Sequence, residues 1–115
     1  MLSDRWRCLR ADAYGCGSSP PPPPGLTLDG VAAALLAALD ELGVTEVAVV
    51  GISMGGYTAM AMLRTAPERV RALVLADTRA AGDGEAARVD RLEMARRVRV
   101  EGVEPIVEPM VQRLL

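Results

Sequence analysis

The sequence predicts an α/β protein with a short, mostly parallel sheet of three strands. Segments typical of strands and helices alternate along the 115 residues in the order β, α, β, α, β. The middle strand contains the run Val-Ala-Val-Val at 47–50, and continuous apolar runs are typical of strands covered on both faces of a parallel sheet. Directly after this strand, a serine between glycines turns the chain into a helix.

The first strand is predicted over residues 5–11 (RWRCLRA), which alternate weakly between charged and apolar side chains and end at Asp12. A helix is predicted over 28–42, where apolar residues recur at helical spacing. Thr27 stands at its N-cap, and Gly43 stands where a left-handed C-terminal cap is expected. This helix is expected to pack on the sheet.

Two irregular segments separate these elements. Residues 12–19 are rich in Gly, Ser and Asp, which is typical of turns. Residues 20–24 are five consecutive prolines, which predict an extended polyproline II spacer on the surface. Docking of an SH3-like partner on these prolines is an alternative to the simple spacer.

The second strand is predicted over 46–50 and leads into GISMG at 51–55, which matches the G-x-S-x-G nucleophile elbow. A serine lifted above the end of a strand by a sharp turn takes a strained backbone conformation. We therefore expect Ser53 to be strained, and we expect Gly51 and Gly55 to lack side chains so that strand and helix can approach each other.

A helix is predicted over 55–66, directly after the elbow, and Gly56 further reduces the side-chain bulk at its start. Its free N–H groups and positive dipole end point toward whatever is bound at Ser53. The backbone N–H of Met54 then forms half of an oxyanion hole. The alternative is an ordinary strand-turn-helix unit in which Ser53 only caps the helix.

The third strand is predicted over 70–76 and ends at Asp77. Parallel strands place a binding crevice at their carboxyl ends, so Ser53 and Asp77 are expected at the same edge. A flexible turn over 79–84 leads to a charged helix that begins at residue 85.

That helix is predicted over 85–100, with an ion pair between Glu93 and Arg97. The last segment, 103–115, contains Pro109, at which we expect a kink or a break.

Composition excludes several kinds of partner. The net charge of −2 gives no basic surface for nucleic acid or a membrane. The longest apolar run, 31–39, is too short to span a bilayer, and the first residues are charged, so we expect a cytoplasmic protein. Cys8 and Cys16 fit no metal or redox spacing, and no cofactor or metal is expected.

Three segments in one order resemble the central part of an α/β-hydrolase: the Asp-Gly-Ser loop at 12–19, the elbow GISMGG, and PERVRALVLADT at 67–78. Within that family, the elbow and the ADTRA ending are most similar to esterases and lactonases of the 3-oxoadipate enol-lactonase type. The resemblance implies a three-layer sandwich, with residues 1–84 as a partial core and 85–115 as the start of a helical cap. It also implies a carboxylic ester, lactone or thioester as the small-molecule substrate.

Carried over to this sequence, the resemblance makes Ser53 the nucleophile and the N–H of Met54 an oxyanion donor. In the family's sheet, a strand from earlier in the chain lies between the strand expected at 5–11 and the one at 46–50, and the resemblance implies that this earlier strand is missing here. The triad acid usually follows a later strand, although some relatives place it after the strand at 70–76, which would select Asp77. The sequence contains no histidine, which is the usual triad base.

Losing a triad histidine lowers turnover about a million-fold. We therefore expect the 115-residue chain by itself to be inactive and to represent a truncated segment of a serine hydrolase. One alternative is a catalytically inactive relative that serves as a binding or interaction module. Another is a cofactor-free perhydrolase, because those relatives also carry an S-M-G-G elbow.

Overall fold

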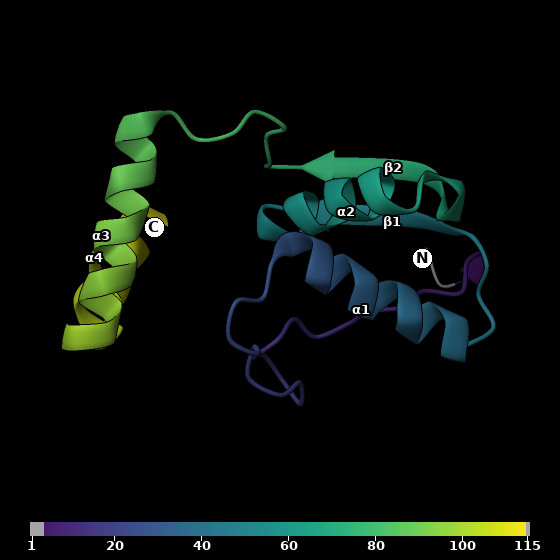
Figure 1. The fold of residues 1–115 in the computed structure, drawn as a ribbon, viewed down its shortest axis with the longest axis horizontal. Helices are drawn as coiled ribbons and strands as arrows, with labels where there is room; N and C mark the ends of the chain where they lie inside the picture. The colour runs from purple at the N-terminus through teal and green to yellow at the C-terminus, as the bar shows by residue number, and fades with distance from the viewer. Residues whose placement is uncertain (1–3, 115) are drawn as a thin grey trace. The chain divides into compact units, whose positions relative to one another are not determined.

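The computed structural model describes residues 4–114. The chain divides into two compact units, Met1–Ala80 and Ala81–Leu115. The first unit holds α1 (Leu28–Glu41), β1 (Val47–Ile52), α2 (Met54–Thr65), the short 3-10 turn η2 (Pro67–Arg69) and β2 (Val70–Ala76) (Figure 1). The second unit holds α3 (Glu85–Glu101) and α4 (Glu104–Leu114).

The two strands β1 and β2 are parallel neighbours, which confirms the predicted α/β class. Val50 lies opposite Val74 and Ile52 lies opposite Ala76, so both strands end at the same edge of the sheet. The helix α2 connects the strands and packs against both of them, and α1 packs against α2 (Figure 1). Among residues 4–114 the sheet has two strands, so the prediction of three is wrong.

Residues 5–11 do not form the predicted strand. They run without regular structure beyond a turn at their start, and neither β1 nor β2 pairs with them. Hydrogen bonds to a neighbouring strand hold a strand in place, and alternation along one segment cannot supply that neighbour. The side chains of this segment are exposed, including those of Trp6 (63%) and Leu9 (45%).

Asp12 closes the loop that follows this segment. Its Oδ2 accepts a hydrogen bond of 3.3 Å from the backbone N–H of Ser18, and its carbonyl accepts one of 2.9 Å from the hydroxyl of Ser19. Gly17 lies at φ +52°, and a Cβ at that position would be 2.0 Å from Oδ2 of Asp12. The left-handed φ therefore favours glycine at this position. The prolines at 20–24 are exposed, as expected of a surface spacer.

The ends of α1 are set by the predicted cap residues. At its start, the hydroxyl of Thr27 accepts a hydrogen bond of 3.1 Å from a backbone N–H of the first turn. At its end, Gly43 has a φ of 66° and donates to the carbonyl of Asp40, while Val44 donates to the carbonyl of Leu39. These two bonds form a Schellman motif, which pairs the last carbonyls of the helix.

The core of the first unit is small and lies between the helices and one face of the sheet. It consists of Ala32, Ala61 and Met62, against which Leu35, Leu36, Leu39, Val47, Val49 and Val70 pack. On the opposite face of the sheet, Val50 and Ile52 are each 64% exposed and Val74 is 54% exposed. Within the first unit, the helices thus cover one face of the sheet.

In the second unit, the ion pairs of α3 differ from the predicted pair. Arg96 donates two hydrogen bonds to Glu93, at 2.9 and 2.8 Å, and Arg97 donates to Glu101 at 3.1 Å. The predicted pair of Glu93 with Arg97 is therefore wrong, because positions three and four residues apart compete for the same partner. The hydrogen bond from Arg96 holds the pKa of Glu93 below its usual range.

The helix α4 continues through Pro109, so the prediction of a break there is wrong, and the alternative of a kink stays a prediction. The carbonyl that loses its partner belongs to Pro105, in the first turn of the helix, where little of the helix precedes the defect. No helix among residues 4–114 is both long enough and apolar enough to cross a membrane.

Candidate active site

Ser53 lies at the junction between β1 and α2. Its backbone angles are φ 50° and ψ −115°, a combination that non-glycine residues rarely adopt. The residue is exposed, and its side chain makes no capping hydrogen bond to α2. The geometry therefore excludes the interpretation of Ser53 as an ordinary helix cap.

Close packing of strand and helix falls on Gly51 and Gly56. A Cβ on Gly51 would lie 2.5 Å from the carbonyl oxygen of Gly55, and a Cβ on Gly56 would lie 2.5 Å from Cγ2 of Thr78. A Cβ on Gly55 would meet nothing within 4 Å. The expectation that Gly55 must lack a side chain is therefore wrong, because its Cα–H points into open space while its backbone approaches Gly51.

Three hydrogen bonds hold the backbone of Ser53. Its N–H donates to the carbonyl of Ala76 at 3.0 Å. Its carbonyl accepts from the N–H of Gly56 at 3.0 Å and from the hydroxyl of Thr78 at 2.9 Å. The sequence reasoning missed Thr78, and the available signal was a hydroxyl residue two positions beyond the end of β2, at the same sheet edge as the elbow.

Met54 is the first residue of α2. The N–H groups of the first turn of a helix have no acceptor within the helix, and the helix dipole places partial positive charge there. An oxygen that gains negative charge beside Ser53 would therefore be stabilised at this helix end. The N–H of Met54 therefore belongs to this helix end and directly follows Ser53.

Asp77 follows β2 directly, as Ser53 follows β1, so the two residues stand side by side at the carboxyl edge of the sheet. Asp77 has a φ of 45°, and it is exposed. Together with Tyr57, Thr78 and Arg79 it lines a shallow hollow of about 260 Å³. The structure thus gathers the predicted nucleophile and the candidate acid at one edge.

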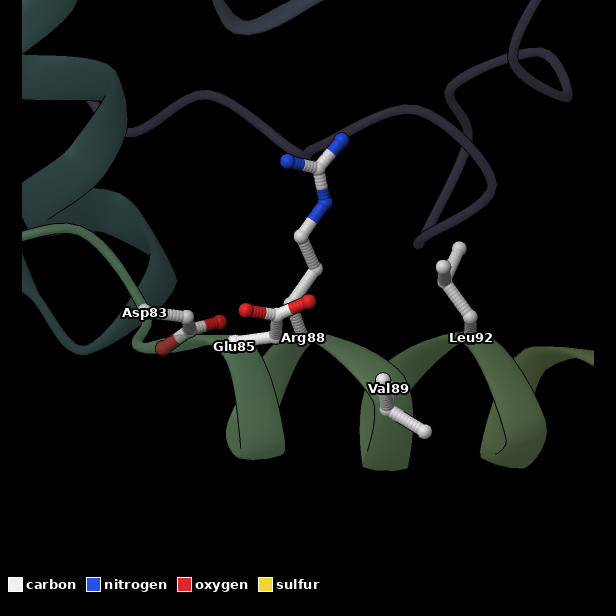
Figure 2. A pocket seen from close by; sticks show the side chains of 5 residues that line it. All are labelled: Asp83, Glu85, Arg88, Val89 and Leu92. Carbon is white, nitrogen blue, oxygen red and sulfur yellow. The ribbon is translucent and has the colours of Figure 1, made fainter.

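A second hollow, of about 450 Å³, lies on the second unit at the start of α3. Figure 2 shows Arg88 and Leu92 projecting from one side of this helix and Val89 from another. Asp83 and Glu85 also line the hollow. Two acidic side chains and one basic side chain line it, and its lining contains no hydroxyl or thiol nucleophile. Among residues 4–114, no three acidic, Cys or His side chains are placed to hold a metal ion.

Comparisons with known proteins agree on one family. A family model described as alpha/beta hydrolase fold matches residues 1–101. The chain is 32% identical over 112 residues to 3-oxoadipate enol-lactonase 2 of Acinetobacter baylyi, covering 97% of this chain and 41% of that protein. It is 44% identical over 77 residues to Lipase LipV of Mycobacterium tuberculosis, covering 67% of this chain and 29% of that protein.

Among solved structures, a thermophilic esterase from Thermogutta terrifontis superimposes with a TM-score of 0.79 at 38% identity, over 87% of this chain and 37% of the esterase chain. The chain thus spans less than half the length of each of these three proteins.

Proposed function

The chain belongs to the α/β-hydrolase fold family, and from this premise we propose that Ser53 is the nucleophile of a serine hydrolase that cleaves a carboxylic ester, lactone or thioester. The observation that carries the proposal is the backbone of Ser53, which lies at φ 50° and ψ −115° with an exposed side chain. Strained residues persist where the surrounding structure holds them, and they cluster at functional sites.

In this reaction the Oγ of Ser53 attacks the carbonyl carbon of the substrate, and its proton passes to a base. The carbonyl oxygen becomes an oxyanion, which the N–H of Met54 stabilises. The tetrahedral intermediate then expels the alcohol or thiol and leaves an acyl group on Ser53. Attack by water on that acyl group releases the acid and restores the serine.

We propose that Asp77 orients the base. Its support is position, because Asp77 follows β2 where Ser53 follows the neighbouring strand β1. These 115 residues contain no histidine that could act as the base. We therefore expect the chain to hold a positioned serine that reacts slowly until a base is provided.

Chemical rescue tests the proposal. The purified 115-residue chain is incubated with a fluorophosphonate in increasing concentrations of imidazole, which stands in for a histidine side chain. Peptide mass spectrometry then gives the rate of adduct formation at each serine. We expect the rate at Ser53 to rise in proportion to imidazole and to exceed the rate at Ser18 by at least about tenfold, since a positioned hydroxyl gains most from an added base.

Two variants complete this experiment. Ser53→Ala should abolish the imidazole-dependent adduct, whereas Ser18→Ala removes an exposed hydroxyl elsewhere and should leave it unchanged. Equal labelling of Ser18 and Ser53 at every imidazole concentration would contradict the assignment of Ser53 as nucleophile.

A binding module without catalysis is the second candidate, favoured by the absence of histidine from the sequence. Its binding surface would be the hollow lined by Tyr57, Asp77, Thr78 and Arg79. Such a protein would bind a small ester or acid at this hollow and would show no rescue by imidazole at Ser53.

A further inference from the structure

Thr78 connects the loop after β2 to the elbow after β1. Its hydroxyl donates a hydrogen bond of 2.9 Å to the carbonyl of Ser53, across 25 positions of sequence. The same side chain lies against the start of α2, because a Cβ on Gly56 would be 2.5 Å from Cγ2 and 2.6 Å from Oγ1 of Thr78. Thr78 is half-buried in this position.

The carbonyl that accepts this bond belongs to the peptide group between Ser53 and Met54. That peptide is planar, and it is trans, since no cis peptide bond occurs among the described residues. In a trans peptide the carbonyl and the N–H point in opposite directions. Fixing the carbonyl of Ser53 at one end therefore fixes the direction of the Met54 N–H at the other.

Of the other two bonds at Ser53, one lies on the preceding peptide, and the other is a backbone bond to the same carbonyl. The N–H of Ser53 belongs to the preceding peptide, and it donates to Ala76. The bond from the N–H of Gly56 closes the first turn of α2 and would form with many side chains at these positions. The hydroxyl of Thr78 is thus the side-chain group that holds the Ser53–Met54 peptide from outside the turn.

We propose that Thr78 is a positioning residue that orients the N–H of Met54 toward the oxyanion. This inference rests on the proposed function, in which that N–H stabilises the charge formed during attack by Ser53. The hydrogen bond also polarises the peptide, because a carbonyl that accepts a bond makes the N–H of the same group a better donor. In this role Thr78 acts on the N–H of Met54 through the peptide that it bonds.

Two substitutions separate the hydroxyl from the packing. Thr78→Val keeps the branched shape against Gly56 and removes the donor, whereas Thr78→Ser keeps the donor and removes the methyl group. In the imidazole-assisted phosphonate reaction, we expect Thr78→Val to lower the maximal labelling rate at Ser53 about tenfold to hundredfold, with an unchanged half-saturating concentration of phosphonate. Thr78→Ser should stay within about threefold of the parent chain.

Thr58→Val is the matched control, because the hydroxyl of Thr58 bonds the carbonyl of Met54 within α2 and not that of Ser53. It should leave the labelling rate unchanged. If Thr78→Val fails to fold, Thr78→Ala takes its place, because it also removes the hydroxyl donor. Equal losses in Thr78→Ser and Thr78→Val would assign the effect to packing and overturn the proposal.

A readout without chemistry keeps this inference separate from the proposed function. In ¹⁵N- and ¹³C-labelled protein, the chemical shifts of the Met54 amide and the Ser53 carbonyl report the peptide and its hydrogen bond. We expect both to move in Thr78→Val and to stay in Thr78→Ser. If Ser53 shows no rescue but these shifts move, the hydrolase proposal fails while the positioning of the peptide stands. Unchanged shifts in Thr78→Val would overturn the role of Thr78.

Discussion

Gly51 of β1 and Gly56 of α2 approach so closely that a Cβ built on Gly51 would lie 2.7 Å from the Cα of Gly56. The same Cβ would lie 2.5 Å from the carbonyl oxygen of Gly55. These neighbours are backbone atoms, which cannot rotate aside as the end of a side chain can. The elbow therefore requires a residue without a Cβ at position 51 of β1.

Gly51→Ala should destabilise the chain by about 3 kcal/mol, because the added methyl group must push β1 and α2 apart. Gly55→Ala is its control, since the methyl group enters open space and alanine favours the helix. That variant should change stability by no more than about 1 kcal/mol, toward greater stability. The urea midpoint of unfolding measures both. If Gly51→Ala destabilises the chain no more than Gly55→Ala does, β1 and α2 do not pack closely at Gly51.

Ser53→Gly should raise the free energy of unfolding relative to Ser53→Ala by about 1 kcal/mol. Both substitutions remove the hydroxyl, but alanine keeps a Cβ at φ 50° whereas glycine adopts this conformation without strain. The strain released outweighs the entropy that glycine adds to the unfolded chain. Thermal and urea unfolding of the two variants check the difference, and an alanine variant at least as stable as the glycine variant would show that no strain is stored at this turn.

The elements that the sequence predicted correctly are those with local signals. The helix α1 follows from Thr27, Gly43 and helical spacing between them, and the turn at Ser53 follows from adjacent glycines. Residues 5–11 have a strand-like pattern, but pairing is a property of two segments and the pattern describes one. The partner was the missing information.

The candidate site shows the same division. Ser53 and Met54 were predicted because the elbow is a continuous run of residues. Thr78 was not, because its bond to Ser53 joins two loops that meet only when β1 and β2 pair in register. Gly55 was given a role that belongs to Gly56, since the direction of each Cα–H depends on the helix start and not on spacing from the serine.

Asp77→Asn and Asp77→Ala separate charge from backbone shape at the end of β2. Asparagine tolerates positive φ, so Asp77→Asn should keep the stability of the chain within about 0.5 kcal/mol. Asp77→Ala should lose about 1 kcal/mol, because alanine adopts φ 45° with strain. If the carboxylate orients the base, Asp77→Asn should also lower imidazole-assisted labelling of Ser53 about tenfold. Undiminished labelling would leave Asp77 as a turn residue alone.

Arg69 should contribute more to the stability of the first unit than Arg71 does. Its side chain is 20% exposed, and its guanidinium donates to the carbonyls of Val44 and Thr45 while pairing with Asp40 at 2.7 Å. These bonds join η2 to the loop between α1 and β1, so Arg69→Ala leaves two carbonyls without their donor and should cost about 2 kcal/mol.

Arg71→Ala is the control for this prediction. Arg71 is 79% exposed and its pair with Glu46 spans 3.5 Å, so the substitution should cost less than about 0.5 kcal/mol. Urea unfolding at low and high salt distinguishes the two: the loss at Arg69 should persist in salt, because hydrogen bonds to carbonyls are screened less than an exposed ion pair. Equal effects of both substitutions would show that the contacts of Arg69 do not hold this loop.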